Sequence, residues 1–190
     1  MRIFKRFEYN APVVLSFALV SLGAWFLNEF TRGTANSLVF STYRAPFTDP
    51  LMYLRLFTHV LGHASLRHYT SNMVYILLLG PILEEKYGSK NLLEMILVTA
   101  LVTAICNNLL FQTGLLGASG IVYMMIILAS MTNFHKGRIP LTLIAVMAIF
   151  LGQEVYDGLF AADNISHLTH ILGGICGCAL GAVSRSGGKR

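Results

Sequence analysis

A serine and a histidine stand in this sequence where apolar residues would be expected. Ser119 lies in the stretch Gly-Ala-Ser-Gly that opens a long apolar run, and His170 lies within another apolar run near the C-terminus. Polar side chains in such surroundings are costly, which makes each one a candidate functional residue. A serine hydroxyl beside an imidazole is the pair that an activated nucleophile requires. We therefore treat Ser119 and His170 as a candidate catalytic dyad.

Three glycines follow His170 on its own helical face. Gly173, Gly177 and Gly181 come at steps of three, four and four residues, the spacing of neighbours on one side of a helix. A glycine stripe lets a second helix approach backbone to backbone. We expect that second helix to be the one that begins at Ser119, which would bring His170 within hydrogen-bond reach of the serine. Alone, the stripe indicates only a helix contact, and Gly-Ala-Ser-Gly only packing; their coincidence favours catalysis.

Another histidine, His68, and the amide Asn72 lie four residues apart, one turn on a common helical face. An imidazole and an amide that project into a cavity can donate hydrogen bonds to an oxyanion, together with the backbone N–H of Ser119 at a helix start. We predict that both are oxyanion-hole residues; the alternative for Asn72 is an interhelical hydrogen bond. We interpret His59 and His63, which precede them, as structural.

Membrane-spanning helices are the elements that must position these residues. Of the 190 residues, 55% are hydrophobic and only 12% are charged, whereas soluble domains carry about 25% charged residues. Six apolar segments are long enough to cross a hydrocarbon core of about 30 Å. They are residues 11–30, 66–83, 92–111, 119–134, 139–155 and 165–183. We predict a single domain, residues 1–190, folded as an all-α polytopic membrane protein with a six-transmembrane-helix bundle.

The basic residues predict how this bundle is oriented. The first span follows a basic stretch but has no Ala-x-Ala-like cleavage site after it, so we interpret it as a retained helix and not a secretory signal. Of the 14 Lys and Arg residues, ten fall on one predicted face and four on the other, and the positive-inside rule then places both termini in the cytoplasm. The formal net charge of +5 reflects this topology and lipid contact. It does not indicate a nucleic-acid surface.

Two segments depart from a plain bundle. The first outer connection, residues 31–65, is about 35 residues long, which is typical of a functional loop. The span 119–134 has 16 residues, about 24 Å of helix, less than the hydrocarbon thickness. Its outer end must stop below the membrane surface, where irregular backbone is tolerated only if protein buries it or water reaches it. Ser119 therefore marks a helix N-terminus inside a cavity.

These motifs resemble those of the rhomboid family of intramembrane serine proteases, in its compact six-helix bacterial form. The matching elements are Gly-Ala-Ser-Gly at Gly117–Gly120, His-x-x-Gly-x-x-x-Gly at His170–Gly177 and His-x-x-x-Asn at His68–Asn72. Family-like spacings ahead of His68 are also found for Arg55, His59 and His63. The departures are Leu54 where the family usually has Trp, Pro81 where it has Gly, and Thr169 where Ala is common.

The resemblance implies a role for each matched residue. Ser119 is expected to be the nucleophile, His170 the general base, His68 and Asn72 the oxyanion partners, and Tyr123 the aromatic that packs on the catalytic imidazole. It further implies an endopeptidase that cleaves transmembrane segments near the outer membrane face, after a small residue, in a bacterial inner membrane. The expected partners are transmembrane substrates and the bilayer, with no cofactor, metal or nucleic acid.

Two alternatives remain open from the sequence. The first is a catalytically inactive rhomboid-like protein that binds membrane helices, which an intact Ser119 and His170 pair disfavours. The second is a metal transporter or haem carrier that uses its histidines as ligands, which the scarcity of inward carboxylates disfavours. Cys106, Cys176 and Cys178 all fall in predicted spans and are odd in number, so we predict no disulfide framework and no redox role.

Overall fold

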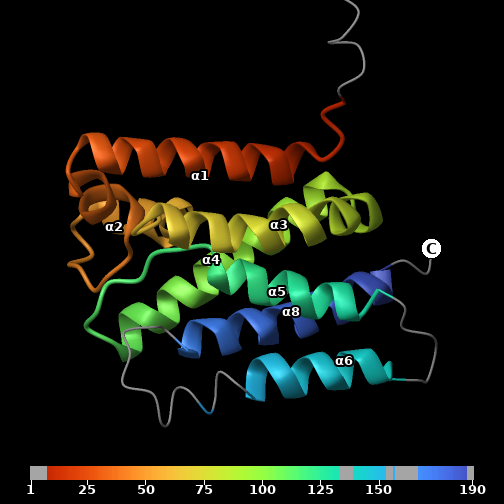
Figure 1. Ribbon diagram of the computed structural model, residues 1–190. Helices are drawn as coiled ribbons and strands as arrows, with labels where there is room; N and C mark the ends of the chain where they lie inside the picture. The colour runs from red at the N-terminus through yellow and green to blue at the C-terminus, as the bar shows by residue number, and fades with distance from the viewer. Residues whose placement is uncertain (1–7, 133–138, 153–155, 157–166, 188–190) are drawn as a thin grey trace, which may run out of the picture.

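The protein is a bundle of helices stacked side by side (Figure 1). The computed structural model describes residues 8–132, 139–152, 156 and 167–187. The long helices are α1 (Pro12–Phe30), α3 (Leu66–Tyr87), α4 (Ser89–Leu110), α5 (Ser119–Ser130) and α8 (His167–Gly187). The shorter helices are η2 (Asn36–Phe40), α2 (Pro50–Thr58), η3 (His59–Leu61), α6 (Leu141–Val146) and η4 (Met147–Leu151).

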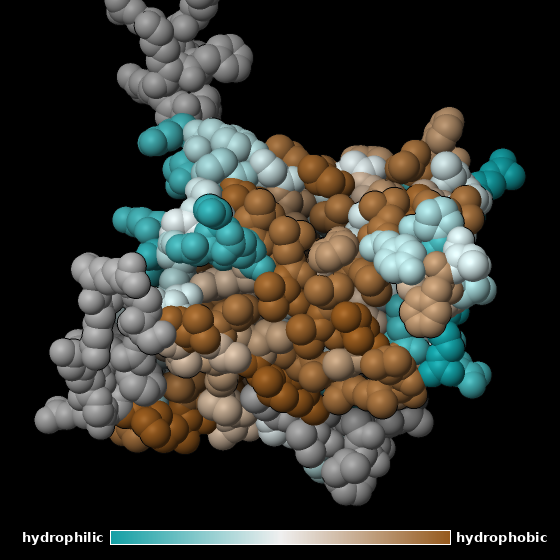
Figure 2. All heavy atoms as spheres, turned by 180° about the vertical axis from the view of Figure 1, so that it is seen from behind, coloured by the Kyte–Doolittle hydropathy of each residue, from teal (hydrophilic) through white to brown (hydrophobic). Residues whose placement is uncertain are grey.

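The helices agree with the predicted all-α membrane class. Within the described residues, three helices are long and apolar enough to cross a membrane, namely Pro12–Phe30, Ser89–Leu110 and His167–Ser184, and two shorter apolar helices cover Ser119–Ser130 and Leu141–Phe150. Figure 2 shows an apolar belt over the middle of the bundle, with hydrophilic residues at both ends. The count of six spans and the side of the termini stay predictions.

Helix boundaries differ from the predicted spans in places. Helix α3 continues to Tyr87, and α4 already begins at Ser89 because Gly88, with a φ of 81°, turns the chain sharply between them. Helix α5 begins at Ser119, where the fourth predicted span starts, and ends at Ser130. Parts of the predicted spans, residues 133–134, 153–155 and 165–166, lie outside the described residues.

Helix α5 forms the centre of the bundle. It contacts α3, α4, α6 and α8, and Figure 1 shows it between α3 and α8. Most of its side chains are buried, including Ile121, Val122 and the run Met124–Leu128. A helix that is apolar on all sides is stable only when neighbours surround it. The sequence of α5 therefore dictates a central position, and the N-terminus at Ser119 is held inside the protein.

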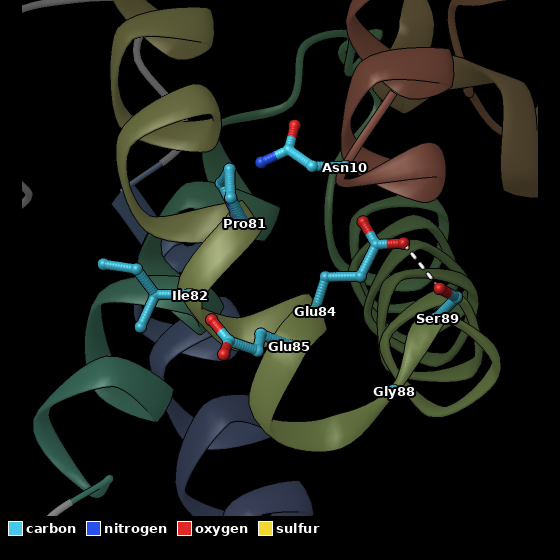
Figure 3. A pocket seen from close by; sticks show the side chains of 7 residues that line it. All are labelled: Asn10, Pro81, Ile82, Glu84, Glu85, Gly88 and Ser89. Carbon is cyan, nitrogen blue, oxygen red and sulfur yellow. Dashed lines mark hydrogen bonds between the residues drawn. The ribbon is translucent and has the colours of Figure 1, made fainter. Parts of the chain in front are cut away.

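The end of the bundle away from Ser119 is closed by a buried carboxylate. Helix α1 begins after Ala11, which supplies no side-chain cap. Instead Glu84 of α3, only 4% exposed, accepts hydrogen bonds of 3.0 Å from the backbone N–H groups of both Val13 and Val14, and one of 2.7 Å from the Ser89 hydroxyl. Figure 3 shows Glu84 and Ser89 in the pocket beside this contact. One side chain thus joins α1, α3 and α4.

Candidate active site

The loop before α5 is pinned in place by the first outer connection. Thr42 and Leu115 exchange two backbone hydrogen bonds of 2.9 and 2.8 Å, and the Gly117 N–H donates to the His59 carbonyl at 2.9 Å. Gly117 has a φ of 120°, a conformation that side chains rarely adopt, and a Cβ there would lie 2.8 Å from His68 Nε2. Only glycine at position 117 therefore allows both the backbone turn that leads to Ser119 and the close approach of the His68 ring.

The glycine face of α8 packs on α5. A Cβ on Gly173 would overlap the carbonyl oxygen of Gly120, and a Cβ on Gly177 would lie 2.6 Å from the Met124 carbonyl oxygen. Gly181 continues the contact, since a Cβ there would lie 2.9 Å from Met131 Sδ. The backbones thus approach as closely as a glycine stripe allows. His170 lies one turn before Gly173, so this contact carries its imidazole to the start of α5.

The imidazole of His170 stacks on the Tyr123 ring. The two ring centroids are 4.5 Å apart and the planes differ by 8°. Tyr123 lies one turn after Ser119 on α5, so the ring that covers the imidazole and the candidate nucleophile come from the same end of one helix. The Phe150 ring meets Tyr123 edge to face, with centroids 6.0 Å apart. Ser119 and His170 are both partly buried.

His68 and Asn72 lie on the first two turns of α3. The ring of His68 faces Gly117, and its backbone N–H donates to the Ser65 hydroxyl at 3.1 Å, which caps the helix. The Asn72 amide is buried and donates to the His68 carbonyl at 3.1 Å. An amide nitrogen has two donors, so this bond uses one and leaves the orientation of the group set by its own helix.

His59 and His63 are buried structural groups. The imidazole of His59 is 1% exposed, with Nδ1 3.2 Å from the Arg55 carbonyl oxygen, and that of His63 is 0% exposed, with Nδ1 3.1 Å from the Leu61 carbonyl oxygen. Burial disfavours the charged ring and lowers the pKa of each to about 4. Both rings are therefore neutral near pH 7, in agreement with the structural interpretation of the sequence.

Two anchors of the first outer connection, the buried Arg55 and the partly exposed Asp49, were given no role from the sequence. Arg55 is 2% exposed, forms an ion pair with Asp49, donates to the Leu38 carbonyl at 3.2 Å and lies 4.3 Å from the Tyr43 ring centroid. Asp49 also caps α2, accepting from the Leu51 N–H at 2.9 Å. The dipeptide Asp-Pro is a helix-start signal that could have identified Asp49. The partners of Arg55, up to 17 residues away, had no local signal.

We also examined the possible metal ligands in the described part of the chain. No group of three or more His, Cys, Asp or Glu side chains there could hold a metal ion. Cys106, Cys176 and Cys178 are free thiols. The acidic residues Asp157 and Asp163 lie outside the described residues.

Comparison with known proteins assigns the chain to a family. The family model for the Rhomboid domain matches residues 50–187. The chain is 23% identical over 157 residues to "Rhomboid protease GlpG" of Haemophilus influenzae, covering 73% of this chain and 82% of that protein. It is 26% identical over 170 residues to the protein of the same name from Pectobacterium atrosepticum, covering 87% of this chain and 60% of that protein.

The matched region contains all of α5 and α8, together with the first turns of α3 that carry His68 and Asn72. Its apolar helices mark the chain as an integral membrane protein. Since the match extends over well more than half of the sequence, the protein belongs to the rhomboid family.

Proposed function

We propose that the protein is a serine endopeptidase that hydrolyses peptide bonds in transmembrane segments of other proteins, with Ser119 as nucleophile and His170 as general base. The observation that carries this proposal is the stack of His170 on Tyr123, one turn after Ser119. The contact of Gly173 with Gly120 supports it, because it brings the backbone of α8 against the residue that follows Ser119.

The reaction proceeds in two stages. As the Ser119 hydroxyl oxygen attacks the scissile carbonyl carbon, its proton passes to the His170 imidazole. The tetrahedral intermediate then breaks its C–N bond, and the imidazolium returns the proton to the departing amine. A water molecule, deprotonated by His170, then attacks the carbonyl carbon of the resulting Ser119 ester. As the C–O bond breaks, the imidazolium returns the proton to the Ser119 oxygen and the second product leaves as a carboxylic acid. The electron-rich face of Tyr123 stabilises the transient imidazolium that it covers.

The oxyanion of the tetrahedral intermediate needs hydrogen-bond donors. The backbone N–H of Ser119, in the first turn of α5, has no partner within its own helix and is available for this purpose. The His68 ring beside Gly117 and the second donor of the Asn72 amide supply two further N–H groups. Substrate binding must bring the carbonyl oxygen between these three donors.

The substrate class follows from backbone chemistry. A peptide bond inside an intact helix has its carbonyl hydrogen-bonded, so a transmembrane substrate must unwind before it can extend past Ser119. Gly or Pro in the substrate lowers the cost of unwinding. We place cleavage near the outer membrane face, after a small residue, as the rhomboid relationship suggests.

The topology completes the proposal. Six spans with both termini in the cytoplasm agree with the distribution of basic residues. Residence in a bacterial inner membrane agrees with the two bacterial relatives. In this orientation the start of α5 faces the outer leaflet. The pocket of Figure 3, at the other end of α3, then faces the cytoplasm.

The test is cleavage of a generic transmembrane reporter by the purified protein in detergent or liposomes. We expect cleavage by the wild type and none by Ser119→Ala or His170→Ala, with both variants as thermally stable as the wild type. A fluorophosphonate probe should label the wild type and not Ser119→Ala. A wild-type protein that binds the reporter, but neither cleaves it nor reacts with the probe, would instead be a protein that binds membrane helices.

A further inference from the structure

We infer that Phe150 is a positioning residue for the proposed reaction: it holds Tyr123, and through Tyr123 it sets the orientation of the His170 imidazole. This inference rests on the proposed function. Phe150 lies on the helix pair α6 and η4, outside all the motifs that the sequence identifies. Its contribution would therefore extend the site to a helix that carries no candidate catalytic group.

Three aromatic rings contact one another in sequence at the start of α5, one pair stacked and the other edge to face. The His170 and Tyr123 rings are nearly parallel, with an interplanar angle of 8°, whereas the Tyr123 and Phe150 rings are nearly perpendicular, at 83°. A parallel stack restrains the tilt of the imidazole only as firmly as the tyrosine ring is itself held. A perpendicular neighbour resists rotation of that ring about its own axis, because rotation would break the edge-to-face contact.

The backbone that carries Phe150 is wound as a π-helix. The five residues Met147–Leu151 form η4, directly after α6. Single π-helical turns are rare in proteins overall, and those that occur are often found at functional sites. Phe150 is partly buried and packs, together with Val146, against the main core cluster that includes α5. The neighbouring Ile149 is 66% exposed on the outside of the same turn.

Helix α6 and η4 lie at the edge of the bundle, beside α5 and α8 (Figure 1). Ile139, Leu141 and Ile144 expose more than half of their surface. Phe150 therefore links an outer helix to the proposed base. Because an active site must hold its groups within about 0.5 Å of the productive geometry, loss of this link should slow the chemical step and leave substrate binding intact.

The experiment compares Phe150→Leu, which keeps apolar volume and removes the ring, with Phe150→Tyr, which keeps the ring. We expect Phe150→Leu to lower kcat about threefold to tenfold, the value of one aromatic pair, with KM unchanged. Phe150→Tyr should keep kcat at the wild-type value. Ile149→Leu, on the exposed side of the same turn, is the matched control and should behave as the wild type. Phe150→Met replaces Phe150→Leu if that variant does not fold.

A second measurement does not depend on cleavage. Stacking under Tyr123 shifts the Cε1–H signal of His170 through the ring current, and the signal is assigned by its loss in His170→Asn. We expect Phe150→Leu to move this signal towards the position of a free imidazole, and Phe150→Tyr and Ile149→Leu to leave it in place.

Two results would overturn the inference while leaving the proposed function intact. One is an unchanged His170 signal in Phe150→Leu; the other is a raised KM with unchanged kcat, which would place Phe150 in the path of the substrate. If the wild type does not cleave the reporter, the proposed function fails, and the His170 signal still decides whether Phe150 orients the imidazole.

Discussion

Gly120 of α5 and Gly173 of α8 lie in close backbone contact. A Cβ on Gly173 would overlap the Gly120 carbonyl oxygen and would lie 3.0 Å from the Gly120 Cα, so no side chain larger than hydrogen fits there. Gly120 directly follows Ser119, and Gly173 lies one turn after His170. The distance between the proposed nucleophile and base therefore depends on helix packing as much as on the two side chains.

Widening this contact should reduce activity without altering either member of the dyad. We predict that Gly177→Val lowers kcat/KM at least about tenfold, because its Cβ would meet the Met124 carbonyl oxygen at 2.6 Å and push the helices apart. Thermal stability in detergent should fall as well. Ala179→Val, at an exposed position of α8, is the control. Equal, near-wild-type activity of both variants would mean that the glycine face does not position His170.

The proposed oxyanion donors can be separated from helix packing. We predict that Asn72→Ala lowers kcat about 10² to 10³-fold, the usual effect of removing one such donor. Ser71→Ala is a matched control, because the exposed Ser71 hydroxyl donates at 3.0 Å to the same His68 carbonyl that Asn72 contacts. Similar losses in both variants would show that the bond to this carbonyl matters and that the free amide donor does not.

His68→Ala tests the second donor. We predict a loss of kcat of the same order, about 10² to 10³-fold, with the backbone N–H of Ser119 retained. Because the His68 ring fills the space beside Gly117, His68→Asn, which keeps an N–H donor, should recover part of the activity. Steady-state cleavage of the reporter measures both variants. Wild-type turnover in His68→Ala would make this histidine structural.

The buried carboxylate of Glu84 should contribute strongly to stability. We predict that Glu84→Gln lowers the free energy of unfolding by about 2 to 3 kcal/mol, since it removes a charged acceptor from two backbone N–H groups at the start of α1. Denaturation in mixed detergent measures the change. Glu85→Gln, at the exposed neighbouring position, is the control and should cost much less. Equal losses would contradict the capping role of Glu84.

Stability should fall with acidity because two imidazoles are buried in their neutral form. Burial lowers the pKa of His59 and His63 from 6.5 to about 4, so between these values the unfolded chain binds more protons than the folded one. The melting temperature should be constant above about pH 6.5 and should fall as the pH is lowered towards 4. His59→Asn should flatten this dependence; an unchanged slope in that variant would contradict it.

Much of the proposed site was predictable because it depends on local patterns. The glycines after His170 share a face through the helical period alone, and Gly-Ala-Ser-Gly indicates the start of a helix wherever that helix lies. The low content of charged residues predicts a membrane protein in the same way. Each of these inferences uses residues a few positions apart, whose geometry the backbone determines before any tertiary contact forms.

Other features were decided only by the packing of the whole bundle. Glu84 caps α1 from about 70 residues away, and Phe150 meets Tyr123 from a different helix. Such contacts depend on which helices become neighbours and how each is rotated, and no periodicity encodes either. The sequence by itself therefore determined the membrane class, the helical faces and the candidate dyad residues. The tertiary structure decided which contacts hold these elements in place, because such contacts form between segments that are distant along the chain.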